Sequence, residues 1–276
     1  MSLSPSSLKG NLKHLASIPH RSKRKLQLFL QGRLRCFKLA LSLVEGRSGI
    51  EIGGPTDVFR GWHTPSRTYG LLYPLPIYDR VASLDNCNFS TETIWATHDQ
   101  TYQFSPRKSP GKTIIAEGSD LFCVSDNSYE FVLSSHNLEH FANPVKALKE
   151  WKRITRPSGS LILVLPDYRR TFDHRRIPTP VEHMLEDYAH NVKEDDATHI
   201  PEVLQLHDLD MDGTLKTHSI DELNARSTSN FLNRCLHHHV FDEFNSADLL
   251  KEVGLELLAV ERALPYHIFI LARWKD

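Results

Sequence analysis

The stretch Ser48–Phe59 (SGIEIGGPTDVF) constrains the fold more than any other part of the sequence. A short apolar run leads into Gly53 and Gly54 and then into a helix start at Pro55. Glycine lets the backbone approach a ligand closely, and proline is pre-set for a first helical turn. This order of elements is typical of nucleotide-binding α/β domains. The dinucleotide fingerprint G-x-G-x-x-G is absent, because Pro55 and Asp57 stand where further glycines are expected.

Charge is unevenly distributed along the 276 residues, whose formal net charge is -1. Residues 1–44 carry nine Lys or Arg and no Asp or Glu, which leaves 24 basic and 34 acidic side chains in the remainder. An acidic body argues against a nucleic-acid partner bound by a broad basic surface. The four cysteines lack C-x-x-C spacing, so we expect a reduced, cytoplasmic environment. No apolar run approaches the roughly 18 residues of a membrane span.

A basic N-terminal segment and helix, residues 1–44, precede the main domain. Residues 1–24 are rich in serine and basic side chains, and Leu26–Val44 has apolar residues near one helical face. Three alternatives stay open. The helix docks on the α/β body, or it lies on an anionic membrane surface as a peripheral contact, or the segment directs import into an organelle.

Strands alternate with helices through most of the remaining sequence. This alternation predicts an α/β, doubly wound, mostly parallel seven-stranded sheet with an antiparallel last strand, plus the N-terminal helix and a cap insertion. The expected strands are 49–52, 78–85, 113–117, 129–134, 160–165, 255–261 and 266–273, and the expected helices are 143–154 and 246–253.

Residues 167–236 interrupt the alternation with a polar, acidic and histidine-rich segment that contains one expected helix, 179–192. An insertion after the fifth strand lies at the carboxyl edge of the sheet, where ligands bind in such folds. We therefore divide the chain into residues 1–44 and a domain over 45–276, with 167–236 as a substrate cap.

The order of motifs resembles a known family. GIEIGG (49–54), SLD (83–85), EGSDL (117–121) and the long run DNSYEFVLSSHNLEHFANPVKALKEWKRITRPSGSLILVLP (126–166) are similar to class I S-adenosylmethionine-dependent methyltransferases of the methyltransferase type 11 group. The later histidine-rich pattern is similar to a bacterial subset of that group. The resemblance implies S-adenosylmethionine as cofactor and methyl transfer as the activity.

Residue by residue, the resemblance implies a donor site at the strand ends. Glu51, Gly53 and Gly54 would line the methionine portion, and Ser135 with His136 would face the sulfonium. Asp120 and Leu121 would take the adenine. Asp85 would hold the ribose, because an acid at the end of the second strand of such a domain accepts two hydrogen bonds from the ribose diol.

Methyl transfer to a hydroxyl or amine also needs a base within hydrogen-bond reach. The candidates at the carboxyl edge are His136, Asp167, Tyr168 and His174, with the two histidines first because imidazole titrates near neutral pH. Arg175 and Arg176 are candidates to clamp an acidic group of the substrate.

Metal binding and the acceptor are left open by the sequence. His183, Asp187 and His190 share one helix face, which suits either a divalent metal ion or ordinary hydrogen bonding. We expect methyl transfer to a small-molecule or glycan-type O or N acceptor. The alternatives are a metal-assisted variant and a non-catalytic donor-binding scaffold; the missing third glycine and Asp120 weigh against an NAD-dependent oxidoreductase.

Overall fold

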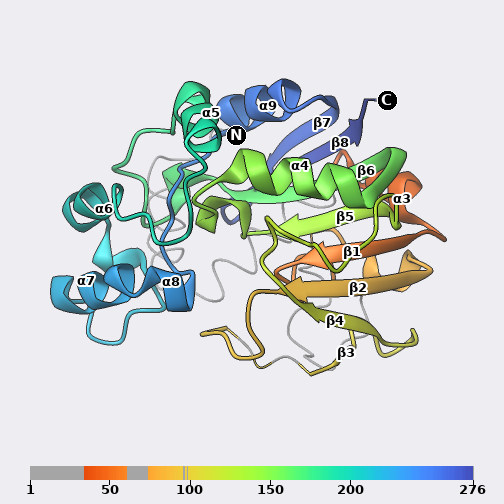
Figure 1. The fold of residues 1–276 in the computed structure, drawn as a ribbon, viewed down its shortest axis with the longest axis horizontal. Helices are drawn as coiled ribbons and strands as arrows, with labels where there is room; N and C mark the ends of the chain where they lie inside the picture. The colour runs from red at the N-terminus through yellow and green to blue at the C-terminus, as the bar shows by residue number, and fades with distance from the viewer. Residues whose placement is uncertain (1–33, 61–73, 96, 98, 276) are drawn as a thin grey trace, which may run out of the picture.

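The computed structural model describes residues 34–60, 74–95, 97 and 99–275, and these form an eight-stranded sheet with helices on both faces (Figure 1). The strands are β1 (Ser48–Ile52), β2 (Ser83–Asn88), β3 (Thr101–Tyr102), β4 (Gly111–Ile115), β5 (Tyr129–Ser135), β6 (Thr155–Pro166), β7 (Leu255–Ala263) and β8 (His267–Trp274). The α-helices are α3 (Phe37–Val44), α4 (Pro144–Ile154), α5 (Val181–Ala189), α6 (Ile200–Leu206), α7 (Ile220–Thr228), α8 (Asn230–Asn233) and α9 (Glu243–Glu252). Short 3-10 helices are η1 (Tyr78–Arg80), η2 (Leu138–His140), η3 (Tyr168–Arg170) and η4 (Leu209–Met211).

The sheet order is β3-β4-β2-β1-β5-β6-β8-β7. Strands β4, β2, β1, β5 and β6 are parallel, whereas β8 is antiparallel to both of its neighbours. The predicted doubly wound α/β fold with an antiparallel last strand is therefore confirmed. The predicted count of seven is one short, because the two-residue strand β3 adds an antiparallel edge beside β4.

Helices cover both faces of the sheet. Because alternate residues of a strand point to opposite faces, one strand can contribute to the core on each face. Ile50 and Ile52 of β1 belong to the core with Trp151 of α4. Leu133 of β5 belongs to the core on the other face, with Leu43 of α3. The described part of the predicted N-terminal helix thus docks on the α/β body, while residues 1–33 lie outside the described residues.

The helix starts follow from capping chemistry. Asn143 accepts a hydrogen bond from the backbone of Lys146, and Pro144 occupies the first position of α4. Asp242 and Asn245 form a reciprocal capping box at α9. These caps fix the two helices that cover the same face of the sheet.

The carboxyl ends of β1, β2 and β5 point toward the side of the molecule that holds α6, α7 and α8 (Figure 1). Helix α5, by contrast, packs against α4 and α9 and so extends the helical layer over the sheet. Among the described helices, none is both long and apolar enough to span a bilayer.

The predicted second strand, 78–85, is wrong at both of its ends. Residues 78–80 form η1 instead, and the strand itself runs from Ser83 to Asn88. The side chain of Tyr78 explains the difference: its hydroxyl is buried against Glu51, and its amide donates to the carbonyl of Phe59. The carboxyl end of β2 is therefore Asn88 and not Asp85.

Candidate active site

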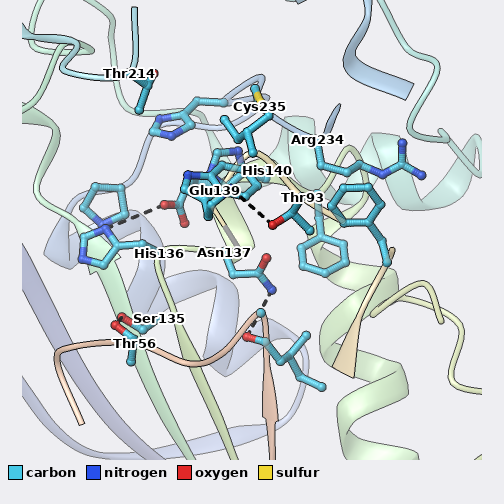
Figure 2. A pocket seen from close by; sticks show the side chains of 18 of the residues that line it. Thr56, Thr93, Ser135, His136, Asn137, Glu139, His140, Thr214, Arg234 and Cys235 are labelled. Carbon is cyan, nitrogen blue, oxygen red and sulfur yellow. Dashed lines mark hydrogen bonds and ion pairs between the residues drawn. The ribbon is translucent and has the colours of Figure 1, made fainter. Parts of the chain in front are cut away.

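A cavity of about 550 Å³ opens at the carboxyl ends of β1, β2 and β5. Its wall combines residues that follow these strands with residues of the segment 167–236. Figure 2 shows Thr56 and Ser135 together at one side of it, with His136, Glu139 and His140 above them and Arg234 across the space. The sheet and the inserted segment thus enclose one shared space.

The turn after β1 requires glycine at its first position. Gly53 has a φ of +81°, and a Cβ there would lie 2.8 Å from the side chain of Asn137. Asn86 accepts from the amide of Gly54 and donates to its carbonyl, both at 3.1 Å, and Asn88 donates to the same carbonyl at 3.0 Å. Both predicted glycines line the cavity, and asparagines of β2 hold their turn in place.

Glu51 lies behind this turn and does not line the cavity. Its side chain is fully buried and accepts hydrogen bonds from the hydroxyls of Tyr78 and Tyr102. Burial raises the pKa of Glu51 to about 7, although the two tyrosine hydrogen bonds act in the opposite direction. A Cβ on Gly54 would lie 2.4 Å from the Glu51 carboxyl carbon, so this acid supports the glycine turn from beneath.

Asp85 is also outside the cavity. One carboxylate oxygen accepts from the amide of Lys112 at 2.8 Å, and the other accepts from the hydroxyl of Tyr129 at 2.9 Å. It is the third residue of β2, three positions before the strand end. Asn88 occupies that end and lines the cavity.

We expect Asn88→Ala to weaken donor binding and Asp85→Ala to leave it unchanged. Asn88 holds the carbonyl of Gly54, and a lost hydrogen bond of this kind costs about 1 kcal/mol, or several-fold in affinity. Asp85→Ala should instead lower the free energy of unfolding, because Lys112 and Tyr129 lose their acceptor. Calorimetric titration with S-adenosylmethionine and denaturant unfolding of both variants measure this. Weaker binding in Asp85→Ala alone would return the donor role to Asp85.

The two residues predicted to bind the adenine, Asp120 and Leu121, do not line the cavity. Asp120 is exposed to solvent, and Leu121 is buried in the core beside α4. Glu117 and Gly118 line the cavity instead, since β4 ends at Ile115, two residues earlier than predicted.

Ser135 ends β5 and His136 follows it, and both line the cavity, as predicted from the sequence. His136 Nε2 lies 2.7 Å from Nδ1 of His267, the first residue of β8. Burial lowers the pKa of His136 to about 3, so its imidazole is neutral near pH 7. It can therefore hydrogen-bond a ligand but is a weak proton acceptor.

The other five candidates do not line the cavity. Four of them form ion pairs. Asp167 is buried between Arg169 and Arg262. His174 and Arg175 both contact the carboxylate of Asp208, and Arg176 is buried between Asp173 and Glu202. Tyr168 lies in η3, with Arg169 over its ring.

Histidines of the cap gather in a different combination from the predicted one. His183 Nε2 lies 3.6 Å from a carboxylate oxygen of Asp187, but His190 is not part of this group. His199 and His239 approach His183 instead. The spacing predicted neighbours of His183 along one helix face. Its neighbours in the structure instead come from other segments, since His199 precedes α6 and His239 lies between α8 and α9.

Two carboxylates that the sequence analysis missed face the cavity, Glu139 and Glu194. Burial raises the pKa of each to about 7. Glu194 accepts from the amide of Ala142, and Glu139 lies 3.9 Å from Nδ1 of His136. Nothing in the local sequence marks either one, because their environment is made by long-range packing.

One family model matches part of the chain. Residues 77–163 match the family model described as a methyltransferase domain. The matched segment runs from η1 into β6 and includes the carboxyl ends of β2 and β5. A sequence search of the curated proteins found no match.

Solved structures similar to this chain come from several organisms. An S-adenosylmethionine-dependent methyltransferase from Aquifex aeolicus is 13% identical, with 99% of each chain covered and a TM-score of 0.44. One from Methanosarcina mazei is 11% identical, covering 88% of this chain and 99% of the other, with a TM-score of 0.44. One from Mesorhizobium loti is 12% identical, covering 86% and 95%, with a TM-score of 0.46.

The residues around the glycine turn fit S-adenosylmethionine, the cofactor that the sequence resemblance implies. At Gly53 and Gly118, an added Cβ would lie 2.8 Å from a neighbouring side chain. Both glycines line the cavity, and the side chains of Asn137 and Phe141 fill the space that a Cβ would take, so neither glycine places a side chain between its backbone and a ligand. A ligand can therefore contact the backbone directly there.

Proposed function

We propose that this chain transfers a methyl group from S-adenosylmethionine to an oxygen or nitrogen atom of a small-molecule or glycan-type acceptor. The proposal rests on one observation: residues of the glycine turn and residues of the cap line the same cavity. Its volume of about 550 Å³ falls within the usual range for ligand sites, about 300–1,000 Å³. Donor-side and acceptor-side residues therefore face one another.

The donor supplies a methyl group that is already activated by its sulfonium. The acceptor's lone pair forms the new bond to the methyl carbon while the carbon–sulfur bond breaks, and the acceptor's proton passes to a base. The main task of the chain is alignment, which can contribute several kcal/mol. Gly53, Asn88 and Ser135 would hold the donor side of this arrangement.

The proton requires a base whose pKa is near the working pH. Glu139 and Glu194, with pKa values raised to about 7, meet this requirement. His136, with its pKa lowered to about 3, does not, so we assign it to hydrogen bonding and orientation.

The acceptor side of the cavity is charged. Arg170, Arg226 and Arg234 line it together with Asp212. Arg226 is paired with Asp212 at 2.7 Å, and Arg234 with Glu117 at 2.7 Å. These residues take the place of Arg175 and Arg176 as candidates for contact with a polar acceptor.

We retain two broader proposals from the sequence. Residues 167–236 act as the substrate cap of a domain spanning 45–276, supported by the cavity residues that this segment supplies. The protein works in the cytoplasm, supported by four cysteines that form no disulfide.

Calorimetric titration of the chelator-treated protein with S-adenosylmethionine tests the function. We expect saturable binding, with NAD as the control ligand showing none. Binding of NAD without binding of S-adenosylmethionine would contradict the proposal. Labelled-methyl transfer to pooled small hydroxylated and amino compounds then identifies the acceptor class.

A further inference from the structure

Two histidines and one glutamate form a compact cluster on the wall of the cavity. Glu139, His140 and His237 all line it, and one potential ligand atom of each lies within 4.8 Å of the other two. Glu139 and His140 belong to η2, directly after β5, while His237 follows α8. Figure 2 shows Glu139 and His140 side by side. The fold therefore brings together three metal-binding side chains from distant parts of the sequence.

Each histidine of the cluster is oriented by a second hydrogen bond. Nδ1 of His237 lies 2.6 Å from the carboxylate of Asp173, and Nδ1 of His140 lies 3.2 Å from the carbonyl of Leu236. Both partners are acceptors, so the ring protons lie on Nδ1 and the lone pairs on Nε2. Metal-binding histidines ordinarily make this kind of bond with their other nitrogen. Arg176 holds Asp173 in place in turn, at 3.0 Å.

The glutamate of the cluster carries an unsatisfied atom. The Glu139 side chain is 1% exposed, and within the described part of the chain its Oε2 has no hydrogen-bond partner. A buried carboxylate oxygen without a partner is costly and unusual in native proteins. A bound cation would satisfy it.

We propose that Glu139, His140 and His237 bind a divalent transition-metal ion such as Zn²⁺, Mn²⁺ or Fe²⁺. Two imidazoles and one carboxylate suit these ions, and three protein ligands leave coordination positions open. Because the ligands line the cavity, the open positions face the acceptor. This rests on the proposed methyl transfer and narrows its acceptor to a compound with a hydroxyl or carboxylate oxygen that can bind the ion. Glu139 is then a ligand, and Glu194 is the base.

Two other histidine clusters in the described residues serve as internal comparisons. One is His183, His199 and His239, and the other is Asp196, His199 and His238. Within the described chain, Nδ1 of His238 and Nδ1 of His239 are buried without a hydrogen-bond partner. Their other ring nitrogens are bonded, since Nε2 of His239 lies 3.4 Å from the carbonyl of Ala142 and Nε2 of His238 lies 3.0 Å from the side-chain nitrogen of Asn230. Neither cluster, however, lines the cavity. Because both contain His199, one substitution disrupts them together.

Equilibrium dialysis of the full chain against Zn²⁺ alone, and then against Mn²⁺ alone, tests the site after chelator treatment. Metal content by mass spectrometry should reach about one ion per chain. Glu139→Gln and His140→Gln should each weaken binding by more than about 100-fold, beyond the effect of losing an outer partner. His199→Gln should retain the ion at wild-type affinity.

Folding of each variant is checked first by circular dichroism. Glu139→Gln keeps the side-chain shape and removes a buried charge, so it is expected to fold. Retention of the ion in both Glu139→Gln and His140→Gln, its loss in His199→Gln alone, or no binding to the wild-type chain would overturn the site. Because no S-adenosylmethionine is present, failure of the separate donor titration would count against the methyltransferase function without affecting this result.

Discussion

Gly53→Ala is expected to reduce S-adenosylmethionine affinity by more than about tenfold and to destabilise the fold. The residue has a φ of +81°, which an L side chain adopts only at a cost of about 1 kcal/mol. Its new Cβ would also lie 2.8 Å from Asn137, on the cavity wall. Relief of that contact moves the turn that supports the donor. Calorimetric titration and denaturant unfolding measure the two effects.

Gly46→Ala is the matched control for this experiment. Gly46 has a φ of +70°, but nothing lies within 4 Å of an added Cβ. It therefore carries the same backbone strain without the collision, and it lies before β1, away from the cavity. Equal losses of donor affinity in the two variants would show that strain, and not the shape of the turn, controls binding.

The contribution of Glu51 to stability should fall as the pH rises from about 5 to about 8.5, and Glu51→Gln should remove that fall. Burial raises the pKa of Glu51 to about 7 in the folded protein, above its usual value of 4.5. Between these values the folded state binds more protons than the unfolded state, so unfolding becomes easier as pH rises. The stability of Glu51→Gln relative to wild type should therefore grow by about 3 kcal/mol across this range. Urea unfolding at a series of pH values measures it.

Glu150→Gln provides the control for the pH experiment. Hydrogen bonds from Arg153 lower the pKa of Glu150, so this carboxylate is ionised in both states throughout that range. Its substitution should shift stability by a constant amount at every pH. A pH-independent difference for Glu51→Gln as well would mean that Glu51 stays ionised in the folded protein.

The sequence predicted those parts of the site that depend on a single strand end. Gly53, Gly54, Ser135 and His136 line the cavity because the ends of β1 and β5 are marked by clear apolar runs. The doubly wound sheet followed from the same alternation. Its extra strand β3 is two residues long, too short to show any period.

Other predicted site residues do not line the cavity, because β2 and β4 end a few residues away from their predicted ends. Asp85 was predicted to end β2, but the buried contact of Tyr78 with Glu51 turns residues 78–80 into η1 and shifts the strand toward Asn88. The sequence predicted the cap as a segment, but not which of its residues line the cavity. His237 reaches the cavity through long-range packing that no local pattern encodes.

The position of β8 between β6 and β7 also sets the order in which the site can be completed. During synthesis β7 emerges before β8, yet β7 joins the sheet only through β8. His267, at the start of β8, supplies the partner of His136. A ribosome-bound chain that has reached only β7 still lacks both the partner of His136 and Tyr266, which lines the cavity. The contact between His136 and His267 therefore forms only when the β7–β8 hairpin closes.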